Sequence, residues 1–347
     1  MQIHQRNLRI LLSLLCVISS GWLLRCGILW SLAGMAAAVL LYPSHSKHSL
    51  LIKALILLLL AGFLFCRNRN ENTSASEKLI VSFLDVGQGD SILIEAPDGK
   101  AFLIDAGTRD SGSSVVSAIK SAGIQSIDYM IETHPHADHI GGFPEVIRSF
   151  SIKSYIKPYI NDFDVPQYPG LTHLKQTLKD HSIPVREVSA GDTIVETDDY
   201  CLSVLSPSSD AVFDDLNDYS LILKLTYGKT SFLFTGDAGY MAELELLDQN
   251  IRTDVLKVGH HGSFGSTCTA FLEETDPDIA IISVGKNNEN NHPNQYVLDR
   301  LDERGIPVYR TDASGTITVI SDGNSVSVST ENHETDTAGE KIPLVLG

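Results

Sequence analysis

The chain has 347 residues and a formal net charge of −17, with 43 acidic residues against 26 lysines and arginines. Its length suits one large domain or two average ones. Such an acidic protein lacks the broad basic footprint with which duplex nucleic acid is bound through its phosphates, so that class of binding is disfavoured. The five cysteines include no C-x-x-C pair, which disfavours a disulfide framework.

The first 66 residues are predicted to be a membrane anchor. Residues 1–70 carry seven Lys or Arg and no acid, whereas the other 277 residues hold 43 acids and 19 bases. An apolar run at 10–42 is interrupted by Arg25, and a second run at 50–66 is long enough to span a bilayer. The first run is too long for one upright helix, so it is either one tilted span or two short ones. We therefore expect two or three transmembrane segments.

A cleaved signal peptide is the alternative for the first apolar run. It fits poorly, because no small-x-small cleavage site follows a short apolar core and hydrophobicity resumes after Arg25. With two spans, the arginines at positions 6, 9, 67 and 69 would keep both termini in the cytoplasm. A third span would place the rest of the chain on the external face.

Polar residues at 67–78 predict a linker, after which strands and helices interleave as in layered α/β folds. Strands are predicted at 79–84, 91–95, 101–104, 154–156, 185–188, 202–205, 220–227 and 230–234, and helices at 113–121, 145–149, 171–180 and 240–247. The domain is expected to span 79–329, and the polar composition of 330–347 predicts a disordered tail.

Residues 134–139 read His-Pro-His-Ala-Asp-His and directly follow an apolar run. Three imidazoles and a carboxylate at this density suit zinc or manganese. In an extended loop His134 and His136 lean the same way, and Asp138 and His139 then turn toward a second position. The loop therefore offers two half-sites. A lone histidine here would be read as a solvated loop residue, but the full pattern is far more specific.

Further polar groups follow other predicted strands. Asp237 comes just after the strand at 230–234, the pair His260 and His261 follows another apolar strand, and His292 lies beyond a third. Alone, Asp237 would be read as a helix N-cap. Together these strand ends deliver polar side chains to the place where layered α/β folds collect their sites.

The combined motifs resemble the metallo-β-lactamase superfamily, and within it the metallohydrolase domain of ComEC-type competence proteins. They occur in the family's order at 85–90, 103–107, 134–142, 234–237, 257–263 and 287–293. The resemblance implies an α/β fold, an αββα sandwich with metals at one sheet edge, preceded in this chain by the N-terminal transmembrane anchor. It also favours an external catalytic domain.

Carried over residue by residue, the resemblance implies two divalent metal ions, zinc or manganese. The implied ligands are His134 and His136 for the first ion, Asp138 and His139 for the second, Asp237 bridging both, and His261, favoured over His260 because Gly262 follows it. Asp105 would orient the cluster from behind. The groups expected to serve catalysis are Asp138, Asp237, His260 and His292, and those expected to contact substrate are Ser263 and His292.

Two departures from the family pattern stand out. Where other members place a further histidine ligand, residues 216–220 read Leu-Asn-Asp-Tyr-Ser, so Asn217 and Asp218 are the nearest polar groups for the first metal. His173 and His181 are expected on the surface. Before His292 the competence-type domain has an aromatic residue and a glycine, whereas this chain has two asparagines.

The expected function is a membrane-anchored phosphodiesterase or nuclease-like enzyme related to DNA-uptake proteins. Two adjacent divalent ions lower the pKa of a bridging water toward about 7, and the resulting hydroxide attacks a phosphorus or carbonyl centre. Single-stranded DNA is one expected substrate class, because a metal centre can hold phosphate locally despite the acidic field. Alternatives are a small phosphodiester, a lactone, or an accessory module with a degenerate metal site.

Overall fold

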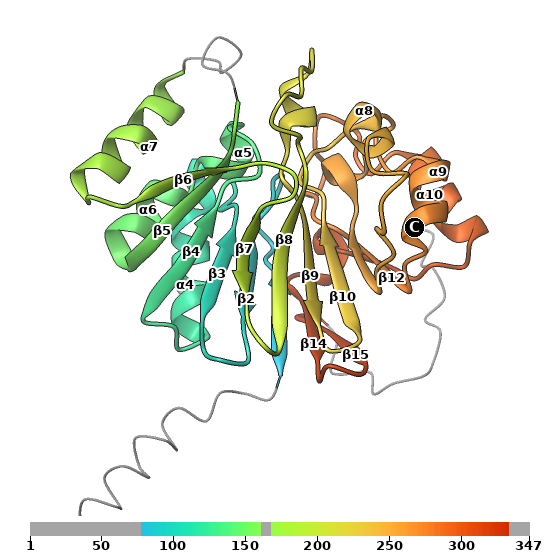
Figure 1. Ribbon diagram of the computed structural model, residues 1–347, viewed down its shortest axis with the longest axis horizontal. Coiled ribbons are helices and arrows are strands. Elements are labelled where there is room, and N and C mark those ends of the chain that lie inside the picture. Colours follow the sequence, from blue (N-terminus) through green and yellow to red (C-terminus); the bar gives the residue numbers. More distant parts are fainter. Residues whose placement is uncertain (1–77, 161–167, 333–347) are drawn as a thin grey trace, which may run out of the picture. The chain divides into compact units, whose positions relative to one another are not determined.

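The computed structural model describes residues 78–160 and 168–332, which form two β-sheets packed face to face (Figure 1). The first sheet has the strand order β15 (Val326–Thr330), β14 (Ile317–Ser321), β1 (Leu79–Phe83), β2 (Ile92–Glu95), β3 (Ala101–Ile104), β4 (Ser126–Ile131), β5 (Ser151–Pro158) and β6 (Val185–Val188). The second sheet has the order β13 (Val308–Arg310), β12 (Ile279–Ile282), β11 (Val255–Lys257), β10 (Thr230–Phe234), β9 (Ile222–Tyr227), β8 (Tyr200–Ser206) and β7 (Thr193–Glu196).

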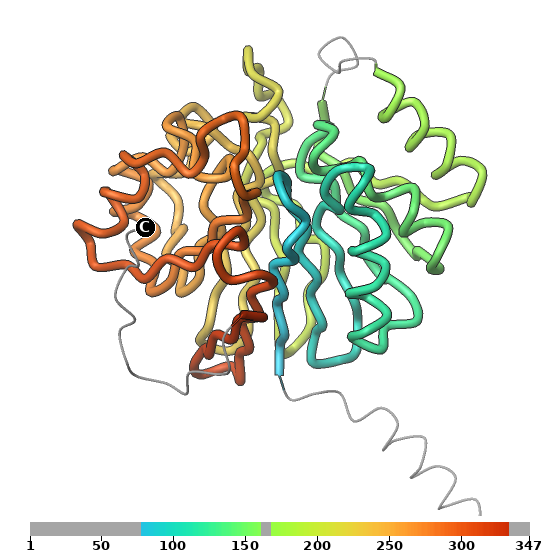
Figure 2. The backbone as a smooth tube through the Cα atoms, turned by 180° about the vertical axis from the view of Figure 1, so that it is seen from behind, coloured from blue at the N-terminus to red at the C-terminus, as the bar shows by residue number. Residues whose placement is uncertain are grey.

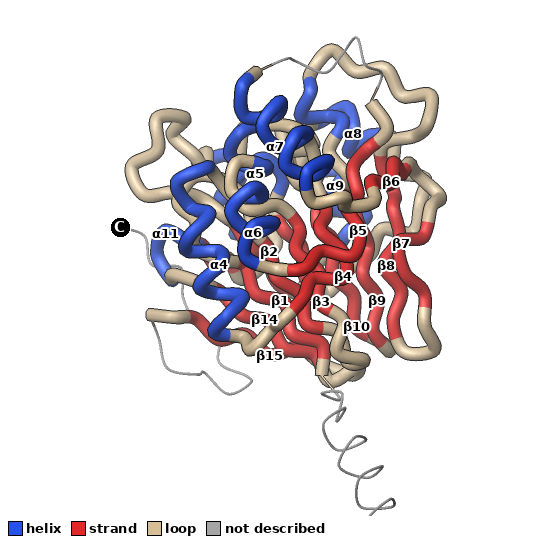
Figure 3. The backbone as a smooth tube through the Cα atoms, turned by 90° about the vertical axis from the view of Figure 1, so that its left-hand side faces the viewer, coloured by secondary structure: helices blue, strands red, loops and turns tan. Residues whose placement is uncertain are grey.

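Helices cover the outer face of each sheet. The first sheet carries α4 (Gly112–Ser121), α5 (Ala137–Ile140), α6 (Phe143–Ser149) and α7 (Pro169–Asp180), which lie in front of its strands in Figure 3. The second sheet carries α8 (Tyr240–Leu244), α9 (Thr269–Thr275) and α10 (Gln295–Glu303). Shorter pieces are α11 (Thr311–Ser314), η1 (Arg109–Ser111), η2 (Leu216–Tyr219) and η3 (Gly259–Gly262). This layering confirms the expected αββα sandwich.

Strand periodicity explains why three apolar layers form. In β3, Phe102 and Ile104 point into the core between the sheets, whereas Leu103 points into the layer under the helices. A strand covered on both faces needs apolar residues at every position, and β3 is buried throughout. Between the sheets, the rings of Phe83 and Phe234 lie with centroids 6.2 Å apart and join the two halves.

The first strand and the last two strands lie side by side although most of the chain separates them. β1 pairs antiparallel with β14, with Phe83 opposite Ile317, and Figure 2 shows the two adjoining segments. No strand was predicted after residue 283, and β7 was not predicted either. The strands β7, β14 and β15 are short and lie in hairpins, so their apolar positions are recognisable only once the partner strand is known.

One predicted strand and one predicted helix are shorter in the structure than expected. The strand expected from residue 220 begins at Ile222, because the residues before it form η2. The helix expected over 240–247 ends at Leu244, and Leu247 N–H donates to the Leu244 carbonyl three residues back. A bond of that span closes a tighter turn and ends the α-helical ladder.

The expected membrane anchor at 1–66 and most of the linker at 67–78 lie outside the described residues, as does most of the tail at 330–347. Within the described part of the chain, every helix is too short or too polar to cross a bilayer.

The fold brings several strand ends to one edge. β3 and β4 run parallel in the first sheet, and β10, β11 and β12 run parallel in the second. The loops that follow such parallel strands lie at their carboxyl ends, where α/β folds bind ligands. Close backbone contacts hold these loops together. A Cβ added to Gly89 would lie 2.2 Å from the Asp138 carbonyl oxygen, so the approach requires glycine, whose φ here is +134°.

Candidate metal centre

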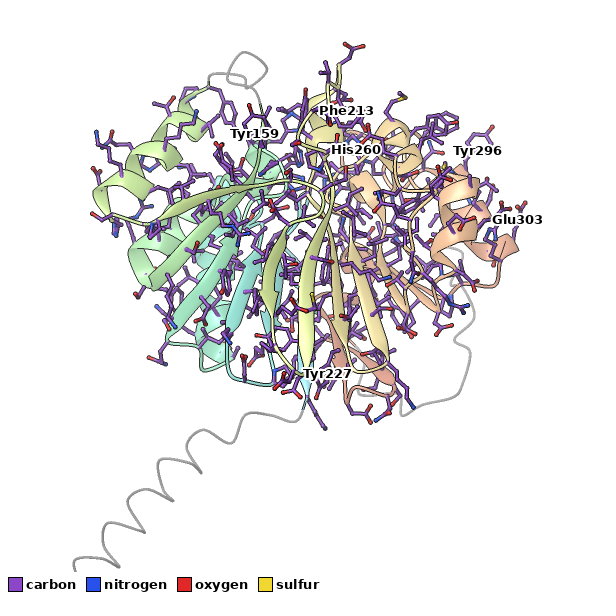
Figure 4. All side chains as sticks on the ribbon, viewed as in Figure 1. Tyr159, Phe213, Tyr227, His260, Tyr296 and Glu303 are labelled. Carbon is purple, nitrogen blue, oxygen red and sulfur yellow. The ribbon has the colours of Figure 1, made fainter. Side chains whose placement is uncertain are left out.

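Each sheet contributes part of one polar cluster at this edge. From the first sheet, Asp105 follows β3, and the loop from His134 to His139 follows β4. From the second sheet, Asp237 follows β10, and His260 and His261 follow β11 within η3. Figure 4 shows His260 at this edge of the sandwich, opposite the end that carries Tyr227.

Four side chains converge on one point. Asp138, His139, Asp237 and His261 each offer a ligand atom, and these atoms lie within 4.8 Å of one another. Asp237 is central, since its Oδ1 lies 3.3 Å from His139 Nε2 and its Oδ2 lies 3.4 Å from His261 Nε2. Asp138 Oδ2 lies 3.5 Å from the same His261 nitrogen. Two carboxylates and two imidazoles form a ligand set that suits zinc or manganese.

Three of these atoms are buried without a hydrogen-bond partner among the described residues: His139 Nε2, His261 Nε2 and Asp237 Oδ1. Buried polar atoms in folded proteins are nearly always satisfied, so an unpaired group that converges on one point calls for an explanation. A cation bound at that point would accept all three lone pairs. The residues present therefore fit a metal ion.

Hydrogen bonds on the far side of each ring set the tautomer of both histidines. His139 Nδ1 lies 2.8 Å from Asp105 Oδ2, and His261 Nδ1 lies 2.9 Å from the Ser283 carbonyl oxygen. A carbonyl oxygen only accepts, so His261 carries a proton on Nδ1, and Nε2 is the nitrogen that can coordinate a metal ion once its own proton is lost. Asp105 is itself held by the N–H and hydroxyl of Thr133, at 2.9 and 2.6 Å. The structure thus places Asp105 behind a ligand, where such carboxylates orient metal centres.

The first half-site is built differently. His134 Nε2 and His136 Nδ1 face each other at 2.9 Å, beside the cluster of four. Asp218, expected near this position, instead accepts the Gly239 N–H at 2.9 Å. The hydroxyl of Ser220 is the closer neighbour, because it lies 3.3 Å from His134 Nδ1 and accepts the Asp237 N–H at 3.0 Å.

Asn217 contributes no atom to the four-residue cluster, and its Oδ1 is buried without a hydrogen-bond partner in the described residues. Of the described histidines, His173 and His181 lie away from the centre and are exposed, as expected. Among the described residues, the further imidazole nearest to His134 is that of His139, whose ring centroid lies 4.2 Å away.

His260 and His292 lie beside the cluster, and Ser263 follows His260 on the same loop. The side chain of His260 is 29% exposed, and its Nε2 lies 3.6 Å from Asp237 Oδ2. The rings of His260 and His292 are nearly perpendicular, with centroids 5.5 Å apart. Ser263 is half-buried on the loop that follows, with its N–H bonded to the His260 carbonyl oxygen at 2.8 Å. The structure thus puts His261 inside the cluster and His260 on its open side.

Comparison with known proteins agrees with this geometry. The family model described as the metallo-beta-lactamase superfamily matches residues 84–286. The chain belongs to the metallo-β-lactamase superfamily.

Within the superfamily, the chain is related to competence proteins. It is 34% identical over 258 residues to ComE operon protein 3 of Bacillus subtilis, covering 68% of this chain and 32% of that protein. It is 30% identical over 293 residues to competence protein ComA of Neisseria gonorrhoeae, covering 82% and 38%. Recombination protein 2 of Haemophilus influenzae is 30% identical over 244 residues, covering 69% and 28%. The chain spans about a third of the length of these relatives, and the resemblance inferred from the motifs is confirmed.

The charges of this metallo-β-lactamase centre are strongly coupled. Burial opposes ionisation of Asp237, but the imidazoles of His261 and His139 outweigh it and hold the pKa of Asp237 well below its usual range. Burial likewise opposes the charged form of His139 and His261, but Asp237 outweighs it and raises both pKa values well above normal. Carboxylates therefore dominate the field at the cluster, which favours a cation there.

His292 has the opposite character. Burial, with help from the charges of His260 and His261, lowers the pKa of His292 to about 4. Its Nδ1 is buried and lacks a hydrogen-bond partner among the described residues. A neutral imidazole with an unused nitrogen beside the cluster can take up a proton or form a hydrogen bond.

Two buried residues at the centre were missed by the sequence analysis. Asp90, at the end of the loop before β2, lies 3.3 Å from His261 Nδ1 through its Oδ1. Lys257, the last residue of β11, lies 2.8 Å from Asp90 Oδ2 through its Nζ. Both belong to motifs that carried the family resemblance, and a lysine inside an otherwise apolar strand was the available signal.

The expectation of two metal ions predicts how metal content responds to loss of the central carboxylate, Asp237. We expect the wild-type protein to bind two equivalents of zinc or manganese, and Asp237→Ala to lower the occupancy of both positions, because the family resemblance implies that Asp237 bridges the two ions. Elemental analysis after dialysis measures this. Uptake of one equivalent or none by the wild-type protein would refute the dinuclear arrangement.

A second prediction concerns Glu132, which directly follows β4 and precedes the loop from His134 to His139. Glu132 is buried and accepts a hydrogen bond from the Tyr155 hydroxyl. Burial, despite that hydrogen bond, raises the pKa of Glu132 from 4.5 to about 7. Ionisation is thus harder in the folded state, so stability falls as the pH rises between these two values. Metal-free Glu132→Gln should match wild type at pH 4 and exceed its unfolding free energy at pH 8, by on the order of 3 kcal/mol.

Chemical denaturation in EDTA across this pH range provides the measurement. Glu145→Gln, which removes a surface carboxylate from α6, controls for a general change in net charge. A constant stability difference between Glu132→Gln and wild type at all pH values would contradict the prediction.

Proposed function

We propose that the protein is a membrane-anchored, metal-dependent phosphodiesterase with a dinuclear zinc or manganese centre. The observation that carries the proposal is the convergence of buried, unpaired nitrogen and oxygen atoms from His139, His261 and Asp237. When bound, divalent ions supply Lewis acidity and make an attacking water acidic enough to ionise near neutral pH.

The chain's own groups have distinct tasks in this proposal. Asp138, His139, Asp237 and His261 hold one metal, and His134 and His136 complete the other half of the centre. Asp105 and the Ser283 carbonyl keep the rings in the orientation that leaves Nε2 free. His260 and His292 lie beside the cluster. There His260 can form a hydrogen bond to the leaving-group oxygen of the phosphodiester, and neutral His292 can exchange a proton with that oxygen.

Single-stranded nucleic acid is the substrate class we favour. Phe264 and Tyr296 form a T-shaped ring pair with centroids 5.6 Å apart, and each residue is 66% exposed. Phe264 is three residues after His261, and Tyr296 is four after His292. Exposed aromatic rings stack on unpaired bases of any sequence, which are inaccessible in duplex DNA.

A small phosphodiester, such as a lipid or cell-envelope head group, is the second candidate. The observation that favours it is the formal net charge of −17, which opposes long polyanions and leaves a short substrate unaffected. Both candidates use the same chemistry at the metal centre, so substrate preference must be measured directly.

The two aromatic residues separate these candidates. With manganese bound, we expect the protein to cleave labelled single-stranded DNA in preference to duplex DNA. Added salt should weaken the binding of that DNA. Phe264→Ala and Tyr296→Ala should each raise the KM for that DNA by roughly 5- to 150-fold, corresponding to about 1–3 kcal/mol per stacked base. Cleavage of a chromogenic phosphodiester, which has no base to stack, should be unchanged and serves as the internal control.

Other outcomes have definite meanings. Turnover of the small ester without cleavage of DNA would favour the second candidate. Turnover of neither substrate, with metal bound, would overturn the phosphodiesterase proposal and leave a lactonase or a non-catalytic accessory module.

We further propose that residues 1–66 anchor the protein in the cell membrane and that the catalytic domain lies on the external face. The apolar runs at 10–42 and 50–66 support the anchor, and the relationship to competence proteins supports the external side. Protease added to intact cells should then degrade the catalytic domain. Complete protection, with degradation after lysis, would place the domain in the cytoplasm.

A further inference from the structure

A buried salt bridge joins the two sheets beside the metal centre. Lys257 Nζ lies 2.8 Å from Asp90 Oδ2, with side-chain exposures of 0% and 2%. Asp90 precedes β2 in the first sheet, and Lys257 ends β11 in the second. Among the described residues, no other lysine or arginine is buried. A buried ion pair adds little net stability compared with an apolar pair of similar size, so stability alone is a weak explanation for this one.

Asp90 is connected to three parts of the centre. Its Oδ1 lies 3.3 Å from His261 Nδ1, the same nitrogen that bonds the Ser283 carbonyl oxygen at 2.9 Å. Its backbone N–H donates to the Asp138 carbonyl oxygen at 3.3 Å, and its own carbonyl oxygen accepts the Gly107 N–H at 2.8 Å. Asp90 therefore contacts the loop of one expected ligand and the ring of another.

Lys257 is equally fixed. Its Nζ also donates to the Val258 carbonyl oxygen at 2.9 Å, and its own carbonyl oxygen accepts the Thr235 hydroxyl at 2.6 Å. The two contacts involve the loops that follow β10 and β11, which carry Asp237 and His260. The ammonium group is therefore a rigid part of the sheet that carries His261.

We propose that Asp90 and Lys257 form a positioning pair for His261. The Ser283 carbonyl oxygen accepts the His261 Nδ1 hydrogen bond, and Asp90 Oδ1, which has no hydrogen-bond partner among the described residues, places a negative charge 3.3 Å from the same nitrogen. Lys257 holds that carboxylate in place and balances its charge. Because Asp90 and Asp138 belong to the first sheet and His261 to the second, the pair fixes the separation of ligands that come from different sheets. The inference rests on the proposed metal centre and is independent of the substrate.

The same geometry argues against a third metal ion at this place. Asp90, Asp105 and His139 also offer ligand atoms within 4.8 Å of one another. However, the Lys257 ammonium already lies against Asp90, and His139 Nδ1 is bonded to Asp105. The Lys257 ammonium group therefore balances the negative charge of these carboxylates in place of a metal ion.

The double variant Asp90→Leu/Lys257→Met tests the pair. Removing both charges leaves neither one buried alone, so the metal-free double variant should unfold at close to the wild-type midpoint. Each single variant should unfold earlier, because one unpaired charge remains buried. If the pair positions His261, zinc affinity in the double variant should nevertheless fall about 10- to 100-fold, as it does when partners of metal ligands are removed.

Zinc affinity is measured without substrate by competition with a chromophoric chelator, and Co²⁺ absorption reports any change in ligand geometry. Glu273→Leu/Arg304→Met is the matched control, since this ion pair has the same 2.8 Å separation but lies on the surface between α9 and the residue after α10. The control should leave zinc affinity unchanged. Wild-type zinc affinity in the Asp90/Lys257 double variant would overturn the proposal.

Asp90→Asn keeps the experiment decisive if the double variant fails to fold. It preserves the shape and one acceptor oxygen while removing the charge, and it should lower zinc affinity several-fold; unchanged affinity would overturn the positioning role. A wild-type protein that binds no zinc or manganese would overturn the metal centre itself. A wild-type protein that binds zinc but cleaves no phosphodiester would overturn only the proposed substrate class.

Discussion

The structure depends on gathering carboxylates and imidazoles from two apolar sheets at one buried point. Asp138 and His139 come from the first sheet, and Asp237 and His261 come from the second. A buried carboxylate is costly unless a donor or cation faces it. Here the charges compensate one another across the sandwich, so the cluster is stable only when the apolar core holds the sheets in register. The core between the sheets therefore determines ligand geometry as directly as the ligands themselves.

Backbone strain contributes at the same place. Asp105, His260 and His261 have φ values of 56°, 47° and 54°, in the left-handed region that non-glycine residues seldom adopt. Left-handed residues with side chains cost energy and persist where surrounding contacts over-determine them. In η3 two such residues in succession turn His261 inward and leave His260 on the open side. One short loop thus separates a buried ligand from a group available to substrate.

Charge and aromatic exposure act in opposite directions on substrate choice. The acidic chain repels long polyanions, while the exposed rings of Phe264 and Tyr296 can attract unpaired bases without a basic groove. The neutral, partly buried His292 has its ring centroid 6.4 Å from that of His261 and lies four residues before Tyr296 in the chain. This combination favours a flexible substrate whose phosphate is held by metal and whose remaining contacts are largely uncharged.

The sequence by itself determined the local features. Six consecutive residues contain four metal-binding side chains, and this spacing needs no tertiary information to be recognised. Alternation of apolar runs and turn residues located most strands and helices as far as β11, and the order of motifs indicated the family. Asp237 and the His260–His261 pair each follow an apolar strand, which the sequence shows directly, but their assignment as ligands came from the family resemblance.

Only the tertiary structure decided which distant groups support those ligands. Asp90 and Lys257 are far apart in the chain, and Ser220 replaces the expected Asn217 and Asp218 as the neighbour of His134. The pairing of β1 with β14 was equally hidden. Local propensity describes a residue's own segment, whereas these contacts depend on the twist, register and packing of two sheets. A lysine in an apolar strand becomes interpretable only when the carboxylate facing it is known.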